Sequence, residues 1–377
     1  MHAPFSPALR VEWRGLDTLQ AAADAWRELA ARAIEPNVFN TSEFMIPAAP
    51  VFGAGAGATL VWSAAGRLMG LFPARLERAP FARAVGWTHP FAPLGTPLVD
   101  RADPEAVIAA WLDHLTRDRS MPAVLLMPLV PTAGPFASSL AAVLERTGRN
   151  HAAFGRHQRA LLAPGSEREH YIERAMSAGR RKELRRQRRR LTEIAPVAFV
   201  PAQDEAGIAD AMKDFLVIEA SGWKGLAGTA AASDLAVRRF VETAVANLAA
   251  EGHARVDRLM LDGRAAAAVI TLVSGDTAWC WKIAYNEDIA RFSPGVQLVV
   301  ELTERLLSEP GIARVDSCAS ADHPMIDHIW RERLDLCDRL IALRPSALPF
   351  GVLCGIESLR RRAIAAARAI RNRFRGR

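Results

Sequence analysis

The chain has 377 residues, of which 50% are hydrophobic, and a mean hydropathy of +0.04. This length predicts two domains, and the composition excludes a mostly disordered chain. The formal net charge is +7, yet residues 360–377 alone contain eight arginines and no acidic residue. Residues 180–190 add seven arginines, one lysine and one glutamate. Basic charge is therefore concentrated in two segments. This indicates contacts at specific positions of the molecule rather than a general affinity for polyanions.

The sequence shows neither a membrane span nor a secretion signal. The longest apolar run, around residues 265–271, is strand-sized, whereas a spanning helix needs about 20 residues. The first residues contain no apolar segment typical of a signal peptide. The four cysteines have no CxxC spacing and no histidine pair at metal-ligand distance, which indicates free thiols in a reducing compartment. We expect a cytoplasmic protein without a metal site.

Residues 1–163 predict one α/β domain. Helices are expected over residues 16–34 and 104–117 and in SLAAVLERTG. Residues 58–78 contain two β-rich runs around an Ala-Gly turn, which predicts a hairpin. MPAVLLMPLVP predicts a short buried strand.

Residues 164–346 predict a second domain. Ser166 and Glu169 form a capping box, from which one long helix is expected to about Ile194. A strand, two helices and three antiparallel strands follow, then a helix that begins at RFSPG, a strand at RVDSCAS, a helix over HPMIDHIWRERL and a closing strand. Residues 347–377 form a third segment, whose apolar residues three and four apart predict a basic amphipathic helix.

The RFSPG motif could bind an anion. Ser293 can cap the following helix, Pro294 suits its first turn, and Gly295 lets a ligand approach the backbone. Unpaired N–H groups at such a helix start favour pyrophosphate. An ordinary capped helix is the alternative.

Two tryptophan-lysine pairs could contact a substrate. In WKIAYNE, strand alternation predicts Trp281 and Tyr285 on one face and Lys282 on the other, where the lysine needs a carboxylate or a ligand. A structural salt bridge explains it equally well. GWKGLAGT begins with Trp223 and Lys224 and lacks the spacing of a Walker loop, so ATP binding is not supported.

The densest ionisable cluster is VDSCASADHPMIDHIW. Asp316 ends the predicted strand, and Asp322 and His323 follow in a loop. A histidine beside acids suits a general base, since its pKa lies near neutrality. Asp322 as a helix N-cap is the structural alternative, and the absence of G-x-S-x-G leaves serine-hydrolase chemistry unsupported.

As a set, these motifs resemble a known family. The succession GRRKELRRQRRRL, GWKGLAGT, LMLDGRAAAAVITL, WKIAYNEDIARFSPG and DSCASADHPMIDHIW resembles the CelD/BcsL-type proteins of the GNAT acyltransferase superfamily, relatives of the FemX-like fold. The resemblance covers residues 165–345, and the N-terminal half more weakly. It implies an α/β (α+β) fold of two tandem GNAT-like lobes, with mixed, mostly antiparallel sheets flanked by helices.

The resemblance also implies direct acyl transfer from acyl-CoA, with no permanently bound cofactor. The implied CoA pyrophosphate site comprises Arg291, Ser293, Gly295 and Val296, of which only Arg291 and Gly295 match the family's pattern. The expected base is His323, steadied by Asp316 or Asp322, with Lys282 and Tyr285 near the acceptor or leaving group. The expected substrate contacts are Trp223, Lys224 and Trp281.

The basic tail favours the branch that resembles bacterial ceramide synthases, which N-acylate a sphingoid base. An interfacial helix would place the site beside a lipid acceptor, so we expect a peripheral protein at the inner membrane. Packing of the tail on the protein is the alternative. The arginines expected to meet lipid headgroups or phosphates are Arg180, Arg181, Arg185, Arg188, Arg361 and Arg368.

Three other functions compete with this interpretation. The same chemistry would serve an exopolysaccharide O-acetyltransferase with a sugar acceptor. A FemX-like transferase would take its group from aminoacyl-tRNA, but residues 180–190 contain no aromatic residue of the kind that RNA surfaces interleave with basic ones, so we expect no nucleic acid. A non-catalytic protein on the same scaffold is the third.

Overall fold

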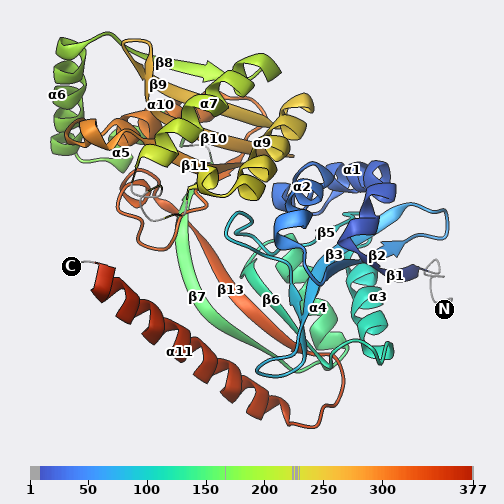
Figure 1. Cartoon of the computed structure of the whole chain (residues 1–377). Helices are drawn as coiled ribbons and strands as arrows, with labels where there is room; N and C mark the ends of the chain where they lie inside the picture. Colours follow the sequence, from blue (N-terminus) through green and yellow to red (C-terminus); the bar gives the residue numbers. More distant parts are fainter. Residues whose placement is uncertain (1–8, 166, 223–224, 226–227, 229, 376–377) are drawn as a thin grey trace. The chain divides into compact units, whose positions relative to one another are not determined.

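A computed structural model of the chain describes residues 9–165, 167–222, 225, 228 and 230–375 (Figure 1). The chain divides into two compact units. The first unit comprises residues 1–37, 53–157 and 335–377, and the second comprises residues 38–52 and 158–334.

The unit boundaries differ from the predicted boundaries at residues 163 and 346. The boundaries after residues 157 and 334 fall inside two long strands, β7 (His151–Leu162) and β13 (Glu332–Ala342), so no linker composition marks them. Residues 38–52 belong to the second unit, and the tail from residue 347 belongs to the first.

The first unit is built on a sheet with strand order β1-β2-β3-β4-β6-β13-β7, and β5 pairs with β3. The β4–β6 pair is parallel, whereas the β1–β2, β2–β3, β3–β4 and β6–β13 pairs are antiparallel. The remaining strands of this unit are β1 (Arg10–Gly15), β2 (Ala56–Trp62), β3 (Leu68–Glu77), β4 (Arg83–Gly86), β5 (Leu98–Val99) and β6 (Val124–Pro131). Its helices are a 3₁₀ helix (Leu16–Ala22), α1 (Ala23–Arg32), α3 (Pro104–Arg117), α4 (Pro135–Arg146) and α11 (Phe350–Arg375).

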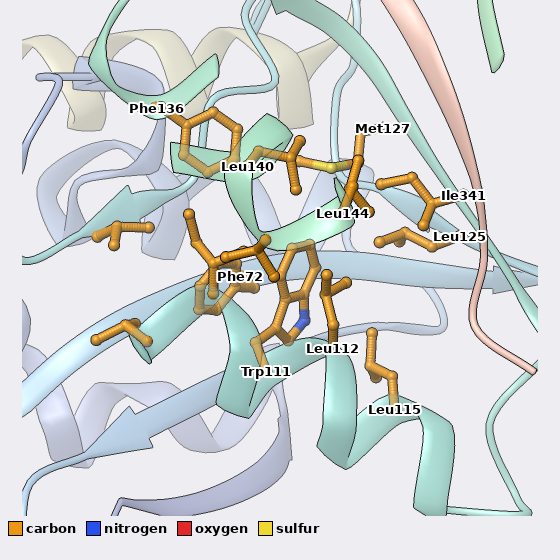
Figure 2. Packing of buried hydrophobic residues seen from close by; sticks show 14 of the residues in the cluster. Phe72, Trp111, Leu112, Leu115, Leu125, Met127, Phe136, Leu140, Leu144 and Ile341 are labelled. Carbon is orange, nitrogen blue, oxygen red and sulfur yellow. The ribbon is translucent and has the colours of Figure 1, made fainter. Parts of the chain in front are cut away.

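Alternation along β6 gives this sheet two buried faces. Leu125 and Met127 face the core under α3 and α4, in which Phe72 and Trp111 stack with ring centroids 4.0 Å apart (Figure 2). Leu126 belongs to a smaller cluster with Leu353 of α11. The predicted hairpin is confirmed as β2 and β3, and α3 has the predicted bounds.

The second unit has the strand order β7-β12-β11-β10-β9-β8. The β11–β12 pair is parallel, and its other pairs are antiparallel. The remaining strands of this unit are β8 (Val197–Ala202), β9 (Ala254–Leu261), β10 (Arg264–Ser274), β11 (Thr277–Tyr285) and β12 (Arg314–Asp316). Its α-helices are α2 (Ser42–Phe52), α5 (Tyr171–Ala175), α6 (Ala178–Ile194), α7 (Glu205–Ser221), α9 (Leu235–Ala250) and α10 (Pro294–Ser308), and its 3₁₀ helices are Val38–Asn40, Ala231–Ser233, Glu287–Phe292 and Ile326–His328.

Helices cover both faces of this second sheet. α5 and α10 pack on one face, and Arg305 of α10 pairs with the buried carboxylate of Asp257 on β9. α2, α7 and α9 pack around an aromatic cluster on the other face, in which Phe44 contacts Phe240 and Trp281 edge to face. The predicted three-stranded meander is confirmed as β9, β10 and β11.

The predicted helix from the Ser166 capping box through the basic segment is wrong. The backbone is extended at Met176, between α5 and α6, and α6 begins at Ala178 with Ser177 Oγ accepting the Arg180 N–H at 3.3 Å. The guanidinium of Arg181 donates to the carbonyl of Met176 at 3.0 Å and stabilises this break. Ser166 lies outside the described residues.

The predicted helix over HPMIDHIWRERL is also wrong. Only one 3₁₀ turn forms, at Ile326–His328, and β13 begins at Glu332. Trp330 is fully buried, and its Nε1 donates to Thr303 Oγ1 of α10 at 2.9 Å. Tertiary packing therefore overrides the local helical spacing. Within the described parts of the chain, we find no helix with the length and hydropathy that a membrane span requires.

Candidate active site

Strands β11 and β12 part partway along β11. Strand β11 pairs with β10 over its whole length, but with β12 only from Thr277 to Trp279. Among the described residues, no strand pairs with the other edge of β11 from Cys280 to Tyr285.

A β-bulge lies at the point where the strands part. Ile270 of β10 is opposite Lys282 and Thr271 is opposite Cys280, so Trp281 is the extra residue. Trp281 packs in the aromatic cluster, whereas Tyr285 packs with the core under α10. The prediction that Trp281 and Tyr285 share a face is therefore wrong, because the bulge shifts the alternation by one residue.

Beside the bulge lies a cavity of about 170 Å³, which we call the β11 cavity. It is lined by residues of β11, of α10 and of the segment after β12: Cys280, Trp281, Lys282, Ile283, Val299, Ser317, Cys318, Ala319, His323, Met325 and Ile326. The structure thus brings Lys282 and His323 to one cavity, as the sequence predicts for a shared site. The Lys282 ammonium lies 6.0 Å from the centroid of the Trp281 ring.

The half-buried ring of His323 is oriented by the main chain. Its Nδ1 accepts the backbone N–H of Met325 at 3.4 Å. A neutral ring that accepts at Nδ1 carries its proton on Nε2. We assign this tautomer from the hydrogen bond, and in it His323 is a donor through Nε2.

Asp316 holds the backbone of Cys318, which lines the cavity. Its buried carboxylate pairs with Arg159 of β7 and accepts the N–H of Cys318 at 3.0 Å. Burial lowers the pKa of Arg159, but the charges of Asp316 and Cys318 and the hydrogen bond with Asp316 together outweigh burial and raise this pKa overall. Cys318 has a φ of 53°, which a residue with a side chain adopts only where its surroundings hold it. Asp322 is exposed, with a φ of 55°.

The two thiols at the β11 cavity are neutral. Burial raises the pKa of Cys280 to about 12, and burial together with the charge of Asp316 raises the pKa of Cys318 well above its ordinary value. Neither cysteine is a thiolate nucleophile at neutral pH. This fits transfer in one step better than transfer through an acyl-cysteine.

The start of α10 lies next to this cavity. A Cβ on Gly295 would meet the ring of Tyr285 at 3.2 Å and the sulfur of Met325 at 3.4 Å, so only glycine fits this packing well. Ser293 occupies the N-cap position in a left-handed conformation. Its side chain makes no capping hydrogen bond, so the predicted cap is wrong. The exposed Arg291 lies over the ring of Phe292 at 4.8 Å, and Val296 packs on the core.

The basic helix α6 lies beside α10. Arg188 donates to Gln297 Oε1 at 3.3 Å and pairs with Glu301 at 3.6 Å. Arg180 and Arg185 are exposed, and the described residues place no carboxylate within ion-pair distance of either. Leu191 of α6 is fully buried.

Sequence reasoning missed one carboxylate at this site, because no pattern in the sequence distinguishes it. Glu219 of α7 is 4% exposed, and its Oε2 accepts the N–H of Ala231 at 2.9 Å. With Ile283 and Tyr285 it lines a cavity of about 30 Å³, enough for a water molecule. The predicted contacts Trp223 and Lys224 lie outside the described residues. No group of three His, Cys, Asp or Glu side chains in the described residues is arranged to hold a metal ion.

The segment that contains these residues matches a known protein family. Residues 178–323, which include α6, the meander, the start of α10 and His323, match the model of the family described as Acetyltransferase (GNAT) domain. Among curated protein sequences, none matches the chain.

Solved structures with similar folds share little sequence with the chain. A conserved protein of unknown function from Bacteroides thetaiotaomicron is 10% identical, with a TM-score of 0.57, 89% of this chain covered and 100% of the other. FemX is 9% identical, with a TM-score of 0.56 and coverages of 85% and 95%. The C-terminal domain of a protein described as a lysylphosphatidylglycerol synthetase, from Agrobacterium fabrum, is 11% identical, with a TM-score of 0.55 and coverages of 86% and 92%.

Residues 178–323 are therefore similar to a GNAT-type acetyltransferase domain. The predicted mixed, mostly antiparallel α/β architecture with a C-terminal helix is confirmed.

Proposed function

We propose that the protein transfers an acyl group from a CoA thioester to an amine, and that the second unit carries the reaction. The observation that supports this most is the parting of β11 and β12 at a cavity lined by Lys282 and His323, inside the GNAT-type segment. An extended pantetheine arm would enter where β11 and β12 part. Its thioester would then reach the β11 cavity.

In the proposed reaction, the amine nitrogen attacks the thioester carbon, the C–N bond forms, and the C–S bond breaks. A backbone N–H near the bulge of β11 stabilises the oxyanion. His323, which we expected to be the base, suits the acid better, because its Nε2–H can protonate the departing thiolate. Glu219 accepts the proton of the attacking amine through a water in the smaller cavity. Lys282 and Tyr285 lie near the acceptor.

We propose a lipid amine as the acceptor, with N-acylation of a sphingoid base to a ceramide as the specific case. The support is the basic helix α11, which suits work at the inner-membrane surface. For the donor, we propose that the CoA phosphates meet Arg291, Gly295 and Val296 at the start of α10 and Arg180, Arg185 and Arg188 of α6.

The alternatives differ in donor or acceptor. An exopolysaccharide O-acetyltransferase would use the same donor and a sugar hydroxyl. The exposed arginines of α6 would equally suit aminoacyl-tRNA as the donor of a FemX-like transferase. A non-catalytic protein would bind without turnover.

A panel of donors and acceptors separates these functions. The full chain is incubated with acetyl-CoA or palmitoyl-CoA and with sphinganine, glucosamine or a polysaccharide fragment, and products are identified by mass spectrometry. We expect an amide of sphinganine. An acylated sugar hydroxyl would instead assign the polysaccharide function. Formation of product from aminoacyl-tRNA alone would assign the FemX-like one.

A further inference from the structure

One face of α11 holds the helix on the first unit. Leu353 is 3% exposed and packs on the sheet face opposite α3 and α4. Four residues on, Glu357 is fully buried and accepts from Arg83 Nη1 at 2.7 Å. Another four residues on, Arg361 pairs with Asp338 of β13 at 2.7 Å. Steps of four residues keep these contacts on one side of the helix, which we call its inner face.

The buried carboxylate of Glu357 makes this attachment specific. Burial alone would raise the pKa of Glu357, but the hydrogen bond with Arg360, the charge of Arg361 and the hydrogen bond with Arg83 hold it below its ordinary value. Removing one partner of such a group leaves a buried charge uncompensated. The first half of α11 is therefore a fixed part of the first unit.

The opposite face of α11 exposes large apolar side chains. Val352 is 46% exposed, Leu359 is 65% exposed and Ile370 is 56% exposed. Spacings of seven and eleven residues bring a helix back to within about 20° of the same direction, so these three side chains form one line. Leu359 stands about 160° around the axis from the buried Glu357, because it is two residues further on. By this angle, the apolar line, which we call the outer face of α11, lies on the side of the helix opposite Glu357.

The charge around this line is of one sign. Of the eight arginines in residues 360–377, Arg360 and Arg361 are paired with Glu357 and Asp338. The sequence of this segment contains no acidic residue. Contact with a nucleic acid would use the arginines and leave the apolar line in water. An anionic lipid surface takes both, since apolar side chains enter the acyl boundary while arginines meet headgroups.

We propose that the outer face of α11, formed by Val352, Leu359, Ala363 and Ile370, binds the surface of an anionic lipid membrane while the inner face holds the first unit. The purpose of this membrane binding rests on the proposed function, because a lipid amine acceptor would lie in the membrane that the helix binds. The binding itself needs no catalysis. The outer face and the inner face thus belong to one helix. Packing of the tail on the protein therefore does not compete with membrane binding.

Vesicle sedimentation with the full chain tests this proposal. The probes are phosphatidylcholine vesicles with and without about 30 mol % phosphatidylglycerol, at low and raised salt. Wild type is expected to bind the anionic vesicles and to be released by salt. Leu359→Glu and Ile370→Glu are each expected to weaken binding at least about tenfold. Each variant loses an apolar side chain that would enter the membrane and gains a negative charge that anionic lipids repel. Val217→Glu on α7 is the matched control, since Val217 is 69% exposed, and it should bind as wild type does.

Three outcomes would overturn the proposal: no binding of wild type to the anionic vesicles, equal binding by Leu359→Glu and wild type, or equal loss in Val217→Glu. Single-stranded RNA that binds wild type and Leu359→Glu alike, with no vesicle binding, would assign the arginines to RNA. Acyl transfer to a water-soluble amine is measured separately. Vesicle binding without transfer would refute the proposed function alone, and transfer without vesicle binding would refute this surface alone.

Discussion

Removal of the Asp316 carboxylate should strongly destabilise the second unit. Asp316 and Arg159 are each 2% exposed, so Asp316→Ala leaves a buried guanidinium without its counter-charge. Breaking such a pair on one side costs about 3–5 kcal/mol. For a unit of this size, each kcal/mol lowers the melting temperature by about 2–4 °C, so we expect a decrease of about 6–20 °C.

Differential scanning calorimetry measures this change, and two variants control it. Asp322→Ala removes an exposed carboxylate and should alter the unfolding free energy by less than about 0.5 kcal/mol. The double variant Arg159→Met, Asp316→Leu removes both charges and should recover most of the loss, with about 1 kcal/mol remaining for the lost hydrogen bond to Cys318 N–H. An Asp316→Ala transition within 2 °C of wild type, or a double variant as unstable as the single one, would show that the pair is not held as described.

Three further predictions concern the site and the tail. His323→Gln should lower kcat by about 10²–10⁴-fold with unchanged melting, measured by steady-state kinetics and calorimetry, if the ring protonates the leaving group. Gly295→Val should raise the KM for acyl-CoA more than it lowers kcat, because the new side chain pushes the start of α10 from Tyr285. The pKa of Glu357 is lowered in the fold, so its stabilising pairing with Arg83 is present above the ordinary carboxyl pKa and is lost as pH falls through the lowered value. Protease cleavage of α11 should accordingly speed up below about pH 4 in wild type, and Glu357→Gln should show fast cleavage already at pH 7.

Local signals predicted the elements that local contacts form. The bounds of α3 follow from Asp103, whose side chain accepts the N–H of Ala106 at 3.3 Å, and from Pro104 in the first turn. The turn between β9 and β10 follows from Asp262 and Gly263, which both adopt positive φ.

Elements fixed by distant contacts escaped prediction. The segment around Trp330 has helical spacing, but a hydrogen bond to α10 fixes it as irregular backbone. Two boundaries of the units lie inside β7 and β13. Because these boundaries lie within strands and not in linkers, the sequence contains no linker that would predict them.

The candidate site was predictable in part. Lys282 and His323 were singled out because a lysine within a strand and a histidine after one are unusual, and the structure places both at the β11 cavity. The bulge at Trp281 has no signature in the residues, since it depends on the register with β10. Glu219 is one acid among many on helix surfaces, and only its burial against Tyr285 distinguishes it.

Release of free CoA thiol tests the proposed chemistry most directly. The purified chain is given acetyl-CoA or palmitoyl-CoA with an amine acceptor, and thiol is followed with a chromogenic reagent beside His323→Gln and the exposed-site control Asp322→Asn. We predict acceptor-dependent release by wild type and by Asp322→Asn, and a loss of at least about a hundredfold in His323→Gln. No release from either acyl-CoA with any amine, or equal rates for wild type and His323→Gln, would contradict an acyl transfer carried out at the β11 cavity.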